Sequence, residues 1–458
     1  MGMINIGLSG VLANQIAMNT TAQNTANVNT VGYSRQEVTQ SSVVEGGIGG
    51  ITIGAGVTVD SIRRVADQAA IGHLQSTSAD FSYASVFQSS MSGMEELLGS
   101  ESLNLTFSLG DFFSSIDEAT VAPESTAYRQ QILSSAQSLA DTFNQISDAL
   151  KEETKNISHL FNGHIDLANN QLARIADLNA AINENKSRGN STAGLEDQLD
   201  LAIQDISENM DVSVIRKPNG DAELSLKSGQ PLVVGNIVAK LDRSIVSGDP
   251  YSLGVTLEFA NETMIAEGIG GAMGAMIDIK TDQIDPKLDQ IDEMASLLAD
   301  EVNLALSTGF DLNGNNPTKE MFNFDPNNPA SSLSVTNMTT DELALSSDAL
   351  AIGNGSVLMD LSALSSQKFS GTTFGLSNIG DAFTQILGDT GMTASQATEN
   401  LKTAQINYNG AVEARESLSG VNSDEEAANL MMYMQSYQAS MKVVSTAQQM
   451  FQSILNAF

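Results

Sequence analysis

Metal-binding or catalytic chemistry in this chain would have to come from a few histidines, acids and glycine-rich stretches. The histidines are His73, His159 and His164, and the spacing of the last two places their rings about 140° apart on a helix. No HExxH motif is present, so the sequence predicts no zinc site. The chain has no cysteine, which removes disulfides, thiolate catalysis and cysteine-based metal sites.

One loop has the spacing of calcium ligands. Asp311, Asn313 and Asn315 alternate as the first ligands of an EF-hand do, but Asn316 stands where that loop needs glycine. No glutamate occupies the twelfth position either, so we expect Asx turns in this loop. The glycines at 46–50 and 268–274 fit no phosphate-binding motif, and no GxSxG elbow occurs. The sequence therefore predicts no catalytic residues, no metal site and no cofactor.

Charge is distributed very unevenly along the chain. The formal net charge is −34, yet no Asp, Glu, Lys or Arg precedes Arg35, and Lys442 is the only charged residue after Glu426. The overall acidity disfavours nucleic acid and anionic membrane surfaces as partners. Uncharged, apolar ends in an acidic protein predict that both ends are buried, against each other and against neighbouring copies.

Both ends have the periodicity of amphipathic helices. The N-terminal stripe includes Ile4, Leu8, Val11 and Met18. In the C-terminal segment, two rows follow a heptad spacing: Leu430, Tyr437, Val444, Phe451 and Phe458, then Met434, Met441, Gln448 and Leu455.

An ordinary helix hairpin within one molecule would also explain these heptads. The near absence of charge on the flanking positions favours burial on several sides, and therefore self-assembly. Before assembly, helices of this kind have few packing partners, and a disordered state that folds on docking is one expectation. The expected assembly surface consists of Ile4, Leu8, Val11, Met18, Leu430, Met434, Tyr437, Met441, Val444, Phe451 and Leu455.

The expected fold class is mainly α with a β insert: terminal coiled-coil helices, a helical body and a small inserted β domain. The helical pattern covers residues 65–98, 105–119, 123–185, 195–210, 275–307 and 378–418, the last with a possible break at 388–391. A Pro-Asn-Gly turn at 218–220 between alternating apolar residues predicts a hairpin, and strands are expected at 231–234, 237–241 and 255–259. Residues 46–59 are expected to form a short β element or connector. The predicted domains are 1–35 with 421–458, 36–210 with 268–420, and 211–267.

Residues 24–36, with the sequence NTANVNTVGYSRQ, resemble the N-terminal signature of flagellar rod, hook and hook-associated proteins. GYSRQ at 32–36 and the segment 419–455 are most similar to the hook-associated protein 1 branch, which stands at the junction of hook and filament. Residues 195–200 are similar to an LxDQRD stretch of that branch, with Leu199 in place of the usual arginine. The signature positions are Asn27, Asn29, Thr30, Gly32, Tyr33, Arg35, Gly420, Asn422, Glu425 and Glu426.

This resemblance implies a structural, non-enzymatic protein that connects the hook to the filament by polymerising through its terminal helices. The N-terminus has no basic region typical of a Sec signal peptide, and the family implies export through the flagellar type III apparatus to the cell exterior. The implied partners are other copies of the chain, the hook protein, hook-associated protein 3 and a cytoplasmic export chaperone on the C-terminal helix. Nucleic acid and membrane are not expected partners.

Two alternatives remain at this point. A hook or distal rod subunit of the same family would share the terminal helices, although GYSRQ and SGVNSDEE argue against it. A secreted hydrolase that uses its coiled-coil ends only to oligomerise belongs to another class. It would need an acid or Ser/His cluster in a cleft, and the sequence nominates none.

Overall fold

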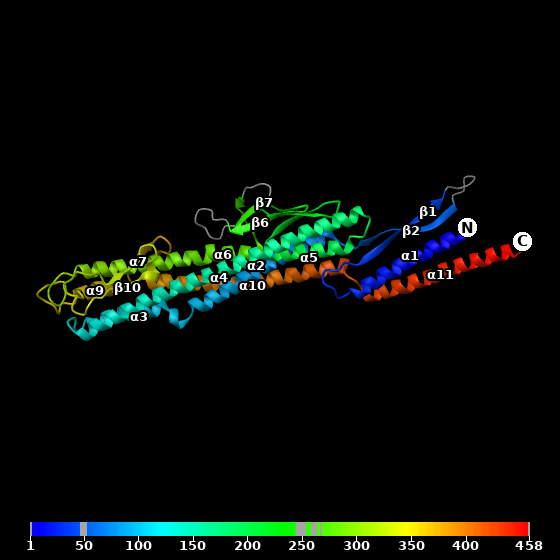
Figure 1. The fold of residues 1–458 in the computed structure, drawn as a ribbon. Coiled ribbons are helices and arrows are strands. Elements are labelled where there is room, and N and C mark those ends of the chain that lie inside the picture. Colours follow the sequence, from blue (N-terminus) through cyan, green and yellow to red (C-terminus); the bar gives the residue numbers. More distant parts are fainter. Residues whose placement is uncertain (1, 46–52, 244–252, 258–262, 266–267, 457–458) are drawn as a thin grey trace. The chain divides into compact units, whose positions relative to one another are not determined.

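The computed structural model describes residues 2–45, 53–243, 253–257, 263–265 and 268–456 (Figure 1). The chain forms two compact units. The first comprises Met1–Tyr83, His164–Ala272 and Thr403–Phe458, and the second comprises Ala84–Gly163 and Met273–Lys402. Long helices dominate and small antiparallel sheets accompany them, which confirms the predicted fold class.

Helices account for most of the described chain. They are α1 (Gly2–Ala26), α2 (Gln68–Leu98), α3 (Leu105–Ala119), α4 (Thr126–Ser187), α5 (Ala193–Asn209), α6 (Gly271–Asp278), α7 (Asp285–Ser307), α8 (Pro329–Ser332), α9 (Ser356–Ala363), α10 (Ile379–Ser419) and α11 (Ser423–Leu455). A 3₁₀ turn, η1 (Glu101–Leu103), precedes α3, and a π-helical segment, η2 (Ile279–Ile284), joins α6 to α7. The periodicity of large apolar residues therefore located α2 to α5 to within three residues at either end.

The strands form one long hairpin, one larger sheet and two short pairs, all antiparallel. The hairpin consists of β1 (Gln36–Glu45) and β2 (Ile53–Arg64). The six-stranded sheet follows chain order through β3 (Val212–Arg216), β4 (Ala222–Leu226), β5 (Pro231–Val234), β6 (Ile237–Arg243), β7 (Leu253–Leu257) and β8 (Thr263–Ile265). The short pairs are β9 (Phe322–Asn323) with β10 (Ser334–Val335), and β11 (Phe369–Gly371) with β12 (Gly375–Ser377).

In the first unit, asparagines of α4 fix the sheet to the helices. The Asn179 side-chain amide donates to the carbonyls of Ala222 and Gly235 at 2.9 and 2.8 Å. Asn169 donates to the carbonyl of Leu241 at 2.9 Å and accepts from the same residue's N–H. Because an amide side chain can satisfy both backbone groups, it replaces a neighbouring strand at the points where the sheet meets the helix.

In the second unit, a buried arginine holds the start of α4. The side chain of Arg129 is fully buried, and its guanidinium donates to the carbonyls of Pro123, Thr340 and Leu343. Burial lowers the pKa of this guanidinium, but carbonyl acceptors still satisfy most of its donors. In the same unit, Phe112 and Phe322 pack edge to face, with ring centroids 6.1 Å apart.

Three sequence expectations need correction. Strand β1 was not expected, and α10 runs without a break through Gly388 and Gly391. A helical glycine costs only about 1 kcal/mol, and the buried side chains of Ile386, Thr390 and Ala394 anchor the helix on both sides. The expected linker at 268–274 is short, because α6 already begins at Gly271.

Other expectations lie partly outside the described residues. In the expected β element at 46–59, residues 53–59 belong to β2 and residues 46–52 are not described. In the expected strand at 255–259, residues 255–257 belong to β7 and the last two are not described. The division into three domains remains a prediction.

Candidate functional site: the paired terminal helices

Helices α1 and α11 lie side by side and antiparallel, so the two chain ends are close together (Figure 1). Their seam is built from small residues. A Cβ added to Gly7 would lie 2.7 Å from Cγ2 of Val444 and 3.3 Å from the carbonyl oxygen of Ser440. A Cβ added to Gly10 would lie 2.8 Å from Oγ of Ser440. A side chain at Gly7 or Gly10 would displace Val444 or Ser440, so glycine lets the two helices approach closely.

A β hairpin packs against another side of α1. Helix α1 contacts both β1 and β2. The N–H of Val57 donates to Oγ of Ser9 at 3.2 Å, and Gly56 has a positive φ of 110° with no room for a side chain beside Ser9. Helix α1 is thus held between α11 and the hairpin. The residues of α1 buried in this way are Gly7, Val11, Ala13, Ala17, Thr20, Thr21 and Asn24.

Helix α11 buries very little. Along its described length only Glu426 and Ala447 are buried. Ser440 faces Gly7 and Gly10 of α1, and Ala447 lies one heptad later. The row that holds Met434 and Met441 follows one residue later, about 100° around the helix, and remains exposed. The heptad repeat therefore contains two faces: a small-residue face used within the molecule and a large apolar face without a partner in it.

The structure divides the expected assembly residues into three groups. Val11 is buried, and Ile4, Met18, Tyr437 and Val444 are half-buried at the edges of the seam. The remaining six are exposed by 41–59%: Leu8, Leu430, Met434, Met441, Phe451 and Leu455. Phe458 lies outside the described residues.

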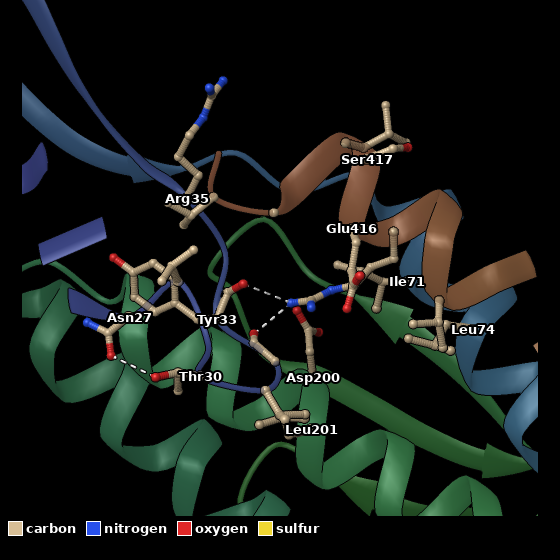
Figure 2. A pocket seen from close by; sticks show the side chains of 18 of the residues that line it. Asn27, Thr30, Tyr33, Arg35, Ile71, Leu74, Asp200, Leu201, Glu416 and Ser417 are labelled. Carbon is tan, nitrogen blue, oxygen red and sulfur yellow. Dashed lines mark hydrogen bonds between the residues drawn. The ribbon is translucent and has the colours of Figure 1, made fainter. Parts of the chain in front are cut away.

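The loop between α1 and β1 is closed by Asn24. Its Oδ1 accepts from the Tyr33 hydroxyl and from the N–H of Gln36, both at 2.9 Å, while its Nδ2 donates to the carbonyl of Gln36 at 2.9 Å. Thr30 Oγ1 donates to Oδ1 of Asn27 at 3.1 Å within the same loop (Figure 2). These hydrogen bonds explain why several polar signature residues cluster here; Asn29 is exposed.

Residues of α10 and α5 fix the other side of this loop. The Arg415 guanidinium donates to the carbonyls of Gly32 and Tyr33 at 2.7 and 3.3 Å, and the N–H of Arg35 donates to the carbonyl of Ser419 at 2.8 Å. Gly32 has a φ of 79°, and a Cβ there would lie 2.4 Å from the Leu201 side chain. Only glycine satisfies both conditions.

The start of α11 is capped and charged. Oδ1 of Asn422 accepts from the N–H groups of Asp424 and Glu425, as expected of an N-cap residue. Gly420 N–H closes the end of α10 on the carbonyl of Glu416 at 2.8 Å. Glu425 pairs with Arg35 at 3.0 Å, so this ion pair links the start of α11 to the loop that follows α1.

A buried ion cluster lies under the same loop. Arg64 at the end of β2 is nearly buried and pairs with Glu196 at 3.0 Å, with Asp197 at 3.2 Å and with Asp200. Arg216 from β3 also pairs with Asp200. Leu199, which replaces the usual arginine of the motif, is uncharged and fully buried in the core. Arg64 and Arg216 are therefore the cations of this cluster.

Two titrating groups connect this cluster to the loop. The N–H of Ser34 donates to Asp197 at 3.1 Å, but burial still raises the pKa of that carboxyl. Burial also raises the pKa of Tyr33 to about 12, and the nearby carboxylates Asp197 and Glu426 act in the same direction. We call this set of interactions around residues 24–36 the clasp.

A cavity of about 840 Å³ opens beside the clasp (Figure 2). Its walls include apolar side chains such as Leu74 and Leu201, and no histidine lines it. Of its three acids, Asp200 and Glu425 are paired with arginines, and Glu416 of α10 is the third.

The remaining candidate chemistry has structural explanations. Oδ1 of Asp311 accepts from the N–H groups of Asn313 and Asn315, each at 2.8 Å, which confirms the Asx turns. Nδ1 of His164 lies 2.6 Å from Oδ1 of Asn209. Within the described residues, no three acids or histidines are grouped so that they could hold a metal ion. No helix in that part of the chain combines the length and apolar character needed to cross a membrane.

Sequence reasoning missed the basic half of the clasp. Arg64, Arg216 and Arg415 belong to no motif. Asp197 lies 133 residues from Arg64, and the carbonyl of Gly32 lies 383 residues from Arg415. The available signal was the small number of basic residues. The chain has 21 Lys and Arg against 55 Asp and Glu, so an arginine in the fold is expected to pair with a carboxylate.

Two segments of the chain match known protein families. Residues 413–457, which contain all of α11, match the C-terminal segment of flagellar basal body rod FlgEFG proteins. Helix α11 thus resembles the C-terminal helix of flagellar axial proteins. Residues 91–322, slightly more than half of the chain, match the family described as Flagellar hook-associated protein FlgK helical domain. The chain belongs to this FlgK family of flagellar hook-associated proteins, which confirms the resemblance noted in the sequence.

Individual relatives agree along the whole length. The chain is 24% identical to Flagellar hook-associated protein 1 of Salmonella typhimurium and 23% identical to that of Escherichia coli, covering 99% of both chains in each case. It is 24% identical to the Bacillus subtilis protein of the same name, over 97% of this chain and 96% of the relative. The solved structure of the flagellar hook junction protein FlgK from Burkholderia pseudomallei shares the fold, with a TM-score of 0.69 and 14% identity over 76% of this chain and 100% of that one.

Proposed function

We propose that this protein is a structural subunit that joins the flagellar hook to the filament, and that it polymerises through α1 and α11. The observation that carries the proposal is the exposed apolar face of α11, which includes Met434, Met441 and Leu455. Such a face is costly on a soluble monomer, and Lys442 is the only charge after Glu426.

Burial against neighbouring copies gives this face a partner. The small-residue seam already pairs α1 with α11, so the pair can act as one unit in a tube while its large apolar residues contact the next subunit. An interface without charge avoids trapping unpaired ions between subunits. The assembly surface predicted from the sequence, from Ile4 to Leu455, is retained here as a proposal, with its exposed members as the main contacts.

The proposed partners follow from the position at the junction. They are further copies of the chain, the hook protein and hook-associated protein 3. Before export, a cytoplasmic chaperone would cover residues 430–458, and the subunit would leave the cell through the flagellar type III apparatus without a Sec signal. The full-length relatives named as flagellar hook-associated proteins support a protein that is not an enzyme.

Truncation tests the role of the terminal pair. Removal of residues 430–458 should leave the remainder of the protein folded, as measured by circular dichroism, because the clasp and the second unit do not include this segment. The truncated protein should fail to attach filaments to hooks. Normal filament attachment by this variant would contradict the proposal.

A hook or distal rod subunit remains the second candidate, since residues 413–457 match a rod protein segment. The FlgK match over residues 91–322 favours the junction. Cross-linking in intact flagella decides between them. A junction subunit should cross-link both to the hook protein and to hook-associated protein 3, whereas a hook or distal rod subunit should not cross-link to hook-associated protein 3.

A further inference from the structure

Methionines are distributed in two very different ways in this chain. Several methionines of the helical body are buried: Met91, Met210, Met273 and Met294 are fully inaccessible. Helix α11 does the opposite. Five of the eight methionines exposed in the described residues lie on it, namely Met431, Met432, Met434, Met441 and Met450.

Met434 and Met441 have the most specific placement. They stand seven residues apart on one face of α11, exposed by 46% and 45%, next to the row that packs on α1. This is the face to which the proposed function assigns burial against neighbouring copies. Flexible thioether side chains suit a surface that must adapt to neighbours of different shape.

The methionines also make this face of α11 sensitive to oxidation. The chain has no cysteine, so an oxidant that reaches an unassembled subunit meets no thiol first. The sulfur of a methionine attacks one peroxide oxygen, the O–O bond breaks, and the second oxygen leaves as water. The sulfur loses two electrons and becomes a sulfoxide, which is polar and disrupts apolar interfaces.

We propose that Met434 and Met441 form an oxidation site that controls assembly: hydrogen peroxide converts them to sulfoxides in unassembled subunits, and burial in the assembly protects them afterwards. The inference rests on the proposed function. Oxidation would then exclude subunits that have not yet joined the assembly and would leave completed junctions intact.

Mass spectrometry tests the protection. Intact flagella and the same protein dissociated from them are treated with equal hydrogen peroxide, and sulfoxide is mapped at each methionine. Met434 and Met441 should oxidise about fivefold or more slowly in the intact flagella. Equal rates in the two samples would overturn the inference.

A genetic test addresses assembly itself. A strain that lacks the gene expresses either the wild type or the double variant Met434→Leu, Met441→Leu while exposed to sublethal peroxide, and filaments per cell are counted. The leucine variant should retain severalfold more filaments than the wild type. An equal loss in both strains would overturn the inference, because oxidation would then act elsewhere.

A polar variant separates this inference from the proposed function. The double variant Met434→Gln, Met441→Gln makes this face of α11 polar in the absence of peroxide. It should abolish filament attachment. The matched control Met359→Gln with Met392→Gln alters two methionines exposed by 71% and 66% in the second unit, and should retain attachment. Attachment by the first pair would reject the proposed assembly face. Loss of attachment there without any peroxide effect would reject the oxidation site alone.

Discussion

At the residue scale, the clasp depends on a few side chains that each satisfy several backbone groups. Asn24 holds Gln36 through both of its side-chain polar atoms, and Arg415 holds two consecutive carbonyls. The family signature around residues 24–36 is therefore mainly a structural device. It sets where α1 ends and where the hairpin begins.

Tyr33 makes the clasp sensitive to alkaline pH. Its folded-state pKa is about 12 against 10.0 for the free side chain, so its contribution to stability is complete below pH 10 and is lost as the pH rises towards 12. We expect Tyr33→Phe to reduce the fall in denaturation midpoint between pH 10 and 12. An unchanged pH profile in the variant would show that Tyr33 is not the titrating group.

Arg64 should be the most sensitive cation in the clasp. Arg64→Met leaves Glu196, Asp197 and Asp200 without their shared cation, and should destabilise the first unit by about 3–5 kcal/mol. The neighbouring Arg63 is the control, because it is exposed and its ion pair with the exposed Glu37 spans 3.5 Å. Arg63→Ala should change the free energy of unfolding by no more than about 0.5 kcal/mol in urea denaturation. Equal effects of the two variants would contradict this account.

At the element scale, the seam between α1 and α11 is set by glycine rather than by large apolar residues. Gly7→Ala introduces a Cβ that would lie 2.7 Å from Cγ2 of Val444 and 3.3 Å from backbone atoms of Ser440 and Val444, so the Val444 side chain and the helix itself must shift. The variant should weaken the pair by about 1–3 kcal/mol. Amide hydrogen exchange in α1 and α11 should accelerate accordingly.

The control for this variant lies in the same helix. Gly2→Ala places a Cβ in open space, since nothing lies within 4 Å of that position. Exchange in α11 should then remain as in the wild type. If Gly7→Ala also left exchange unchanged, the close approach of the two backbones would be refuted.

The elements also show what the sequence could and could not predict. Heptad spacing found α11, because apolar residues seven apart are visible in one sequence. It could not show which face packs within the molecule, since a close seam selects small residues such as Ser440 and Ala447 that no apolar pattern marks. Strand β1 was missed because its sequence, QEVTQSSVVE, is largely polar, and pairing with β2 depends on backbone hydrogen bonds.

The ion cluster was unpredictable for a different reason. Arg64 and Asp197 are 133 residues apart in the chain, and only the tertiary fold brings them together. An acidic protein offers too many carboxylates for sequence alone to choose the pair. The acidic stretch at 195–200 was visible as a motif, but its cations were not.

At the scale of the whole molecule, charge and apolar surface are separated. The acidic body, with most of the net charge of −34, stays soluble, while the two ends carry almost no charge and keep a large apolar face open on α11. The expectation that the ends are disordered before assembly is not what the structure shows, because α1 and α11 already pair. What they leave uncovered is the surface assigned to assembly.

Electron microscopy of flagella tests this assignment most directly. A strain that lacks the gene is complemented with the wild type, with Met434→Gln plus Met441→Gln, or with the control Met359→Gln plus Met392→Gln. We expect filaments on hooks with the wild type and the control, and bare hooks with the α11 variant although the protein folds and is exported. Normal filaments in cells that carry only the α11 variant would contradict the claim that this face builds the junction.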